Sequence, residues 1–261
     1  MFRKSFLTLV CLVSCAVSAT AQDIFLLGEI HDNPTHHDIQ AQWIDRIAPS
    51  AVVFEMLTPQ QAQAVMDLSN RSTDDIRDVT QWDQSGWPSF DIYAPVFDAV
   101  GNRPIIGAGV PRDDMRAVMA QGVVASFGAQ QAAQFGLDQP LDAGQQMQRE
   151  QAQLVAHCNA MPGEMLPIMV DLQRYRDAVL ARAAVAALDQ FGAPVVVITG
   201  NGHARKDWGV PVYIAAARPE LNVFALGLYE AGAADFGQFD QTLTAEPVTR
   251  PDPCAGFTAG G

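Results

Sequence analysis

The chain has 261 residues, of which 49% are hydrophobic and 17% charged, a composition typical of a globular protein able to bury a full-sized core. Its formal net charge of −13 excludes nucleic acid as a partner, because binding to phosphates requires an excess of Lys and Arg. We expect one large domain with an inserted helical lobe.

Residues 1–21 have the features of an export signal. Arg3 and Lys4 precede a short apolar run, and a small-residue cleavage site ends at Ala21. No later stretch reaches the roughly 20 apolar residues that a transmembrane helix needs. We therefore expect a soluble protein exported to the bacterial periplasm, with a mature chain of residues 22–261 whose net charge is −15 once two basic residues are lost.

A lipoprotein signal is a second interpretation of the same segment. The run Leu12-Val13-Ser14-Cys15 resembles a bacterial lipobox, in which Cys15 becomes the acylated first residue. The protein would then be anchored to the outer membrane through that lipid. We expect no other contact with a membrane.

The first four apolar runs of the mature chain predict buried strands, and their near-continuous Val, Ile, Leu and Phe content is typical of strands covered on both faces. They are residues 23–28, 51–55, 104–109 and 193–200. Two later runs, 210–216 and 222–228, are predicted to complete the sheet.

Helical patterns separate these strands. Asn33 is a predicted N-cap with Pro34 at the first helical position, and an apolar stripe continues until Pro49. Strand signals are absent from about 112 to 191, which predicts a helical lobe ending at Gly192. The expected fold class is α/β, a mostly parallel central sheet flanked by helices, with the lobe inserted.

The mature chain contains two cysteines, Cys158 and Cys254. Because an exported protein meets an oxidising compartment, a disulfide between them is expected, fastening the Pro-rich tail of residues 246–261 to the middle of the protein. Two free thiols or a soft-metal pair is the alternative.

The pattern Gly-x-x-His follows two of the predicted strands, as Gly28 to His31 and as Gly200 to His203. Glu29 lies within the first motif, and Glu55 ends the second strand. In an open parallel sheet, the carboxyl ends of the strands form the ligand-binding edge. We therefore expect these polar side chains to converge there.

Three kinds of chemistry suit this cluster. His31, Glu55 and His203 could bind a divalent metal ion, namely Mn, Fe, Co or Zn, with open coordination positions. Without a metal, a histidine paired with Glu29 could act as a general base toward water. A purely structural polar network is the third interpretation.

The segments "LLGEIHDNPTHH", "VVFEML", "SGWPSFDIYAPVFDAV", "MLPIMVDLQRYRDAVLA" and "ITGNGHARKDWGVPVYI" resemble the ChaN family of haem-binding uptake proteins, in the Tiki superfamily. The likeness runs from about residue 23 to residue 229. It implies an exported protein of iron acquisition, often a lipoprotein, that binds haem as a homodimer. More distant members of the superfamily include metal-dependent proteases and erythromycin esterases, which similarly use such histidines and a strand-end Glu.

The resemblance also implies a tyrosine ligand to the haem iron, with a histidine of the partner subunit near the haem. Tyr93, in a Trp-rich region, and Tyr175, beside Arg176 on a lobe helix, are the candidate tyrosines, whereas the other two mature tyrosines are expected to pack in the core. The arginine could pair with propionates or roof the strand-end site, or it could form an exposed pair with Asp177. His36 and His37 are further haem candidates, but neighbours in a first helical turn diverge, so at most one joins the site. For either histidine, a solvent-facing or capping role is the plainer interpretation.

We therefore expect a haem- or iron-binding protein that acts in uptake. The alternative is a metal-dependent or His-activated hydrolase that uses Glu29, His31, Glu55 and His203. A noncatalytic interaction domain has the least support.

Overall fold

Six strands form one sheet in the order β3-β2-β4-β1-β5-β6, and every neighbouring pair is parallel. The computed structural model describes residues 22–233 and 237–255, so the predicted export signal, Cys15 and the end of the tail lie outside the described residues. The predicted α/β class with a parallel sheet is confirmed. The strands are β1 (Ile24–Leu27), β2 (Ala51–Phe54), β3 (Ile105–Gly107), β4 (Val195–Ile198), β5 (Val223–Glu230) and β6 (Gln241–Ala245).

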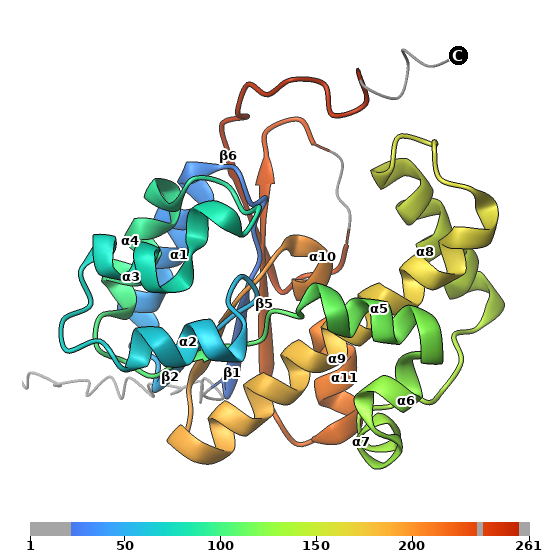
Figure 1. Ribbon diagram of the computed structural model, residues 1–261, viewed down its shortest axis with the longest axis horizontal. Coiled ribbons are helices and arrows are strands. Elements are labelled where there is room, and N and C mark those ends of the chain that lie inside the picture. The colour runs from blue at the N-terminus through green and yellow to red at the C-terminus, as the bar shows by residue number, and fades with distance from the viewer. Residues whose placement is uncertain (1–21, 234–236, 256–261) are drawn as a thin grey trace, which may run out of the picture.

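Helices cover both faces of the sheet (Figure 1). Successive strand residues face opposite cores, so Leu26 packs in one core and Leu27 in the other. The helices of one face are α1 (Pro34–Ile47), α2 (Pro59–Met66), α3 (Thr73–Thr80) and α4 (Phe90–Val100). Those of the other face are α5 (Arg112–Gln121), α6 (Val123–Phe127), α7 (Ala129–Gln134), α9 (Leu166–Phe191) and α11 (Val210–Ala217). Helix α8 (Ala143–Ala156) packs on α9, and the short α10 (Asn201–Ala204) follows β4.

Helix α1 begins as the sequence predicts. The Asn33 side chain accepts a hydrogen bond from the Thr35 amide, Pro34 occupies the first turn, and Ala48 ends the helix in a left-handed conformation. This helix and its cap fix the loop that follows β1, which carries the first Gly-x-x-His motif.

One prediction about the last strands was wrong and one strand was missed, whereas residues 222–228 form a strand as predicted, within β5. Residues 210–216 form helix α11, because Val210, Tyr213 and Ile214 are buried at helical spacing and Val212 is exposed. Their β-branched and aromatic composition favoured a strand, but packing of a helical face against the core decided the outcome. The sixth strand is instead β6, a largely exposed edge strand whose sequence QTLTA has no apolar run.

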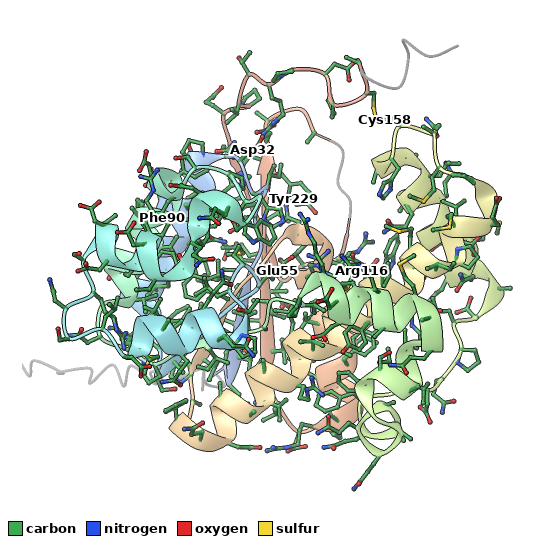
Figure 2. The ribbon with its side chains drawn as sticks, viewed as in Figure 1. Asp32, Glu55, Phe90, Arg116, Cys158 and Tyr229 are labelled. Atoms are coloured by element: carbon green, nitrogen blue, oxygen red, sulfur yellow. A yellow bond between two sulfur atoms is a disulfide. The ribbon has the colours of Figure 1, made fainter. Side chains whose placement is uncertain are left out.

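Cys158 and Cys254 form a disulfide, with their Cα atoms 5.4 Å apart, as the sequence predicts. Figure 2 shows Cys158 at the tip of the lobe beside the C-terminal tail. Nearer β6, Arg250 of the tail donates hydrogen bonds to Asp32 and Glu230. The tail is thereby attached to both the lobe and the loop after β1.

In the described part of the chain, the structure has no helix of sufficient length and apolar character to span a membrane.

Candidate functional site

The two Gly-x-x-His motifs meet at the carboxyl edge of the sheet. Strands β1 and β4 are adjacent and parallel, with Leu27 opposite Ile198, so the motifs leave the sheet side by side. The His31 ring lies against Gly200, where an added Cβ would come within 2.9 Å of the ring Nε2. A glycine is therefore needed at this position to admit the ring of the other motif.

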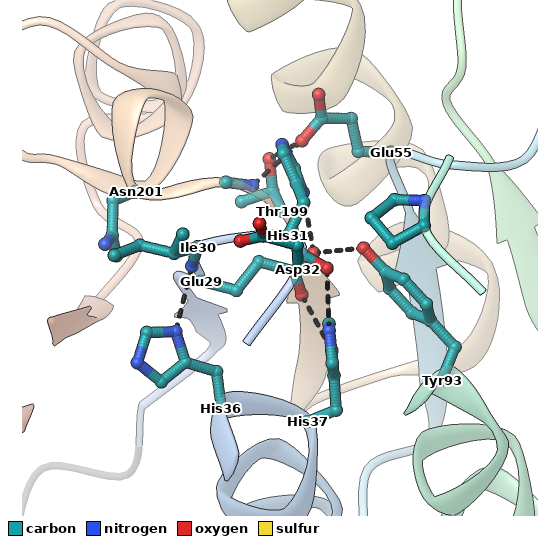
Figure 3. Close-up of polar contacts among 12 residues, drawn as sticks. Glu29, Ile30, His31, Asp32, His36, His37, Glu55, Tyr93, Thr199 and Asn201 are labelled. Carbon is teal, nitrogen blue, oxygen red and sulfur yellow. Dashed lines mark hydrogen bonds and ion pairs between the residues drawn. The ribbon is translucent and has the colours of Figure 1, made fainter. Parts of the chain in front are cut away.

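Glu29 fixes the orientation of His31. The Glu29 Oε1 atom lies 2.7 Å from His31 Nδ1 and also accepts a hydrogen bond from the Tyr93 hydroxyl at 2.6 Å, while Gln40 donates to Oε2 at 2.8 Å. Figure 3 shows Glu29 between His31, His37 and Tyr93. Burial opposes ionisation of the Glu29 carboxyl, but hydrogen bonds from His31 and His37 outweigh it and lower the pKa to about 2. With Nδ1–H held by this carboxylate, a neutral His31 presents the Nε2 lone pair on the side of Gly200.

Glu55 lies at the centre of the second half of the site. Its Oε2 accepts hydrogen bonds from the Thr199 hydroxyl and the Gly200 amide, and its Oε1 accepts one from Arg176 Nη2 at 2.7 Å. Burial opposes its ionisation, but His203 and Arg176 outweigh it and hold the pKa of Glu55 well below its ordinary value. Glu55 is therefore a buried carboxylate with both oxygens engaged.

His203 is buried between two carboxylates. Its Nδ1 lies 2.6 Å from Asp177 Oδ1, and its Nε2 lies 3.4 Å from Glu55 Oε1. Burial lowers the pKa of His203, but the charges of Glu55 and Asp177 outweigh it and raise the pKa to about 9. At neutral pH His203 therefore carries a proton. Both Arg176 and Asp177 turn toward this site, so the interpretation of an exposed surface pair was wrong.

His36 and His37 are both buried, contrary to the solvent-facing role expected for them. His36 Nδ1 accepts a hydrogen bond from the Ile30 amide, and its Nε2 donates to the Tyr229 carbonyl, so both nitrogens are used within the fold. His37 Nε2 donates to the His31 carbonyl, and its Nδ1 lies 3.4 Å from Glu29 Oε2. His37 thus holds the Glu29 carboxylate in place, and neither imidazole ring is available to a ligand or a partner subunit.

The tyrosines proposed as haem ligands lie away from the cavity. Tyr93 is fully buried with its hydroxyl on Glu29, so it cannot present an aromatic wall to a porphyrin. Tyr175 packs in the lobe core, edge-on against Phe127. Tyr213 is a core residue as expected, whereas Tyr229 is buried and also forms part of the cavity wall.

A pocket of about 430 Å³ opens above these residues, and we refer to it as the strand-end pocket. Its volume is within the range of small-molecule sites. The residues that line it and could contact a ligand include Ile30, His31, Arg176, Arg205 and Tyr229. Glu29, Glu55 and His203 form its polar floor.

The geometry does not support the predicted metal site of His31, Glu55 and His203. Within residues 22–233 and 237–255, no group of three or more His, Cys, Asp or Glu side chains is arranged to hold a metal ion. The physical reason is that Glu55 is saturated by hydrogen-bond donors and His203 Nδ1 is occupied by Asp177.

Asp177, Gln40 and Thr199 are site residues whose roles the sequence did not reveal. Asp177 was considered only as a partner of Arg176, although its position on the lobe helix places it over His203. Gln40 lies on α1 one turn after the adjacent histidines, and this spacing puts it on the face that meets β1. Thr199 precedes the second motif directly, but nothing in the sequence links it to Glu55.

Comparison with known proteins gives a consistent result. The family model described as haem-binding uptake, Tiki superfamily, ChaN matches residues 16–214. The structure is similar to that described as cofacial heme binding to ChaN of Campylobacter jejuni, with a TM-score of 0.61 and 18% identity over 84% of this chain and 86% of that one. The structure of an erythromycin esterase mutant, EreC, in its open conformation is more remote, with a TM-score of 0.44 and 12% identity over 81% of this chain and 71% of that one. No curated protein matches the sequence.

Proposed function

Because the chain belongs to the ChaN family of haem-binding uptake proteins in the Tiki superfamily, we propose that its strand-end pocket is the haem site. The observation that carries this proposal is the His31 ring, which Glu29 holds through Nδ1 at 2.7 Å while Nε2 lies on the side of Gly200, another residue of the pocket wall. A neutral imidazole nitrogen is a common axial ligand of haem iron in proteins.

The pocket walls suit the remainder of a porphyrin. Ile30 and the Tyr229 ring supply apolar surface. The guanidinium groups of Arg176 and Arg205 also lie in the walls, where Arg176 is paired with Glu55 and Arg205 with Asp207, and a propionate would bind to their remaining N–H donors. Propionate carboxylates pair favourably with arginine, because the planar guanidinium can donate two parallel hydrogen bonds. When bound, haem would supply the iron centre. This chain would supply the axial ligand of the iron through His31 and the positive groups that pair with the propionates.

A titration with haemin tests this proposal. The mature protein should produce a saturable shift of the Soret band, and His31→Ala should weaken binding at least tenfold. His157→Ala is the matched control, because this histidine lies on the lobe and its Nδ1 bonds to the Gln153 carbonyl. Equal haemin affinity of the two variants would remove His31 from the haem site, and the lack of a saturable shift would refute haem binding.

A His-activated hydrolase is a second candidate, favoured by the same Glu29–His31 pair. His31 Nε2 could take a proton from water, and His203, protonated at neutral pH, could return one to a leaving alkoxide. Turnover of p-nitrophenyl acetate that His31→Ala abolishes and His157→Ala preserves would support this activity. If all three proteins hydrolyse the ester equally, the hydrolase candidate fails, whatever the haemin titration shows.

Export, uptake and dimer formation belong to the same proposal. The basic and apolar character of residues 1–21 supports export to the periplasm, and the mass of the mature N-terminus distinguishes cleavage after Ala21 from acylation at Cys15. A homodimer is supported by the cofacial haem binding described for the Campylobacter jejuni protein. Light scattering with and without haemin should show a doubling of mass on haem binding, and an unchanged monomer would contradict it.

A further inference from the structure

A second cavity of about 320 Å³ adjoins the strand-end pocket, and we refer to it as the side pocket. Glu55 and Arg176 stand in the walls of both cavities. The other walls come from residues 56–61 at the start of α2, the loop that carries Trp87, residues 108–111 with the start of α5, and α9. A cavity of this volume can hold a small organic molecule.

One part of the side-pocket wall is apolar. Trp87, Met115 and Leu180 supply aromatic, thioether and aliphatic surface, and a methionine side chain adapts readily to the shape of a ligand. The Trp87 ring also makes an edge contact with His31, at a centroid distance of 4.9 Å. These walls suit a small molecule that has an apolar portion.

The charged groups of the side pocket are two arginines and one carboxylate, so one positive charge is left unbalanced. Glu55 already has both oxygens engaged by the donors described above. Arg176 is bonded to it through one of its guanidinium nitrogens, although a guanidinium carries five N–H donors. Throughout the described parts of the chain, no hydrogen bond or ion pair engages the side chain of Arg112, an exposed residue at the start of α5.

The acidic residue next to Arg112 does not neutralise it. Asp113 is paired with Arg116, one turn further along α5, at 2.6 Å. In a protein with 29 acidic and 16 basic residues, an arginine that faces a cavity without a carboxylate partner is available to an anion from solution.

We propose that the side pocket binds a small organic carboxylate with an apolar body. Its carboxylate lies between Arg112 and Arg176, and its apolar part packs against Trp87, Met115 and Leu180. This site adjoins the proposed haem site and shares Arg176 with it, whereas Arg112 lines the side pocket and not the strand-end pocket.

Calorimetric titration of the mature protein with phenylacetate tests the proposal, with phenylacetamide as the neutral molecule of the same shape. Phenylacetate should bind saturably, and phenylacetamide at least tenfold more weakly, because only the acid can pair with the arginines. Arg112→Gln should weaken phenylacetate binding about tenfold, the effect of losing one charge-assisted hydrogen bond. Arg116→Gln is the matched control, since its side chain is 73% exposed and outside the pocket.

A filled pocket gives a second check. Met115→Trp should abolish phenylacetate binding, because a larger side chain at this half-buried position occupies the cavity. No saturable binding of phenylacetate to the unaltered protein, or equal weakening by Arg112→Gln and Arg116→Gln, would overturn the proposal. Both arginine variants should retain the Soret shift with haemin, so failure of this site is distinguishable from failure of the haem site.

Discussion

Replacing Gly200 by alanine should disable the strand-end pocket while leaving the fold intact. The backbone of Gly200 has φ −65° and ψ 153°, values that any L-residue adopts, so alanine introduces no backbone strain. Its Cβ would, however, lie 2.9 Å from His31 Nε2 and 3.1 Å from Cε1. Carbon atoms in contact normally keep about 3.5–4.0 Å apart, so the ring must retreat by roughly half an ångström or swing away.

The hydrogen bond from His31 to Glu29 limits how far the ring can retreat. At 2.7 Å it is a short, charge-assisted bond, and breaking such a bond costs about 1.5–3 kcal/mol when no other partner replaces it. The His31 side chain is 35% exposed, so water can recover part of this loss. We therefore expect the free energy of unfolding to fall by only about 1 kcal/mol, while haemin affinity falls at least tenfold.

Gly202→Ala provides the matched control two residues away. Its Cβ would meet only Gln173 Nε2, at 3.8 Å, which is ordinary contact. Urea unfolding and Soret titration of both variants separate stability from binding. If Gly200→Ala binds haemin as tightly as Gly202→Ala does, the contact between the two motifs is unimportant for the ligand and the reasoning fails.

Three further predictions concern the groups around the pocket. Because the pKa of His203 is raised from 6.5 to about 9, its stabilising contribution is complete below pH 6.5 and lost as pH rises through 9. Between pH 6.5 and 9, the unfolding free energy of the unaltered protein should fall by up to about 3 kcal/mol more than that of His203→Gln. If the two proteins lose stability in parallel as the pH rises, the raised pKa of His203 is contradicted. Replacing Cys158 and Cys254 by serine should cost about 2–4 kcal/mol in urea unfolding, and mass spectrometry that finds two free thiols in the unaltered protein would refute the bridge. Tyr93→Phe should cost about 1–3 kcal/mol by removing a buried bond to Glu29 yet leave the Soret spectrum unchanged, and a changed spectrum would reinstate this tyrosine as a haem ligand.

The sequence predicted those features that depend on local pattern. The strand ending at Leu27 and the cap at Asn33 follow from an apolar run and the residues next to it. The meeting of the two Gly-x-x-His motifs, which are far apart in the chain, follows from the predicted parallel sheet, whose strands end at one edge. Helix α11 was missed because its β-branched residues suit a strand equally well, and only the core it meets selects the helix. Tyr93 was wrongly expected to face a haem, because the burial of a side chain depends on the folded chain and not on its neighbours in sequence.

The electrostatic partners were harder to foresee. Asp177 reaches His203 from a helix of the lobe, and Tyr93 reaches Glu29 from α4, so each bond joins elements that are distant in sequence. Spacing along one element cannot reveal such a contact. The pKa directions, which depend on these partners and on burial, were therefore inaccessible before the structure was known.

The position of β1 has a consequence for how the protein acquires its structure. This strand is the first of the described residues, yet it lies inside the sheet, and Ile24 pairs with Val195 on one side and Val223 on the other. Neither neighbour exists until most of the chain has been made, so the sheet cannot close during synthesis, and contacts of such long range slow folding. Because such a chain stays open until its last third has emerged, the late closure of the sheet would suit the export that we propose.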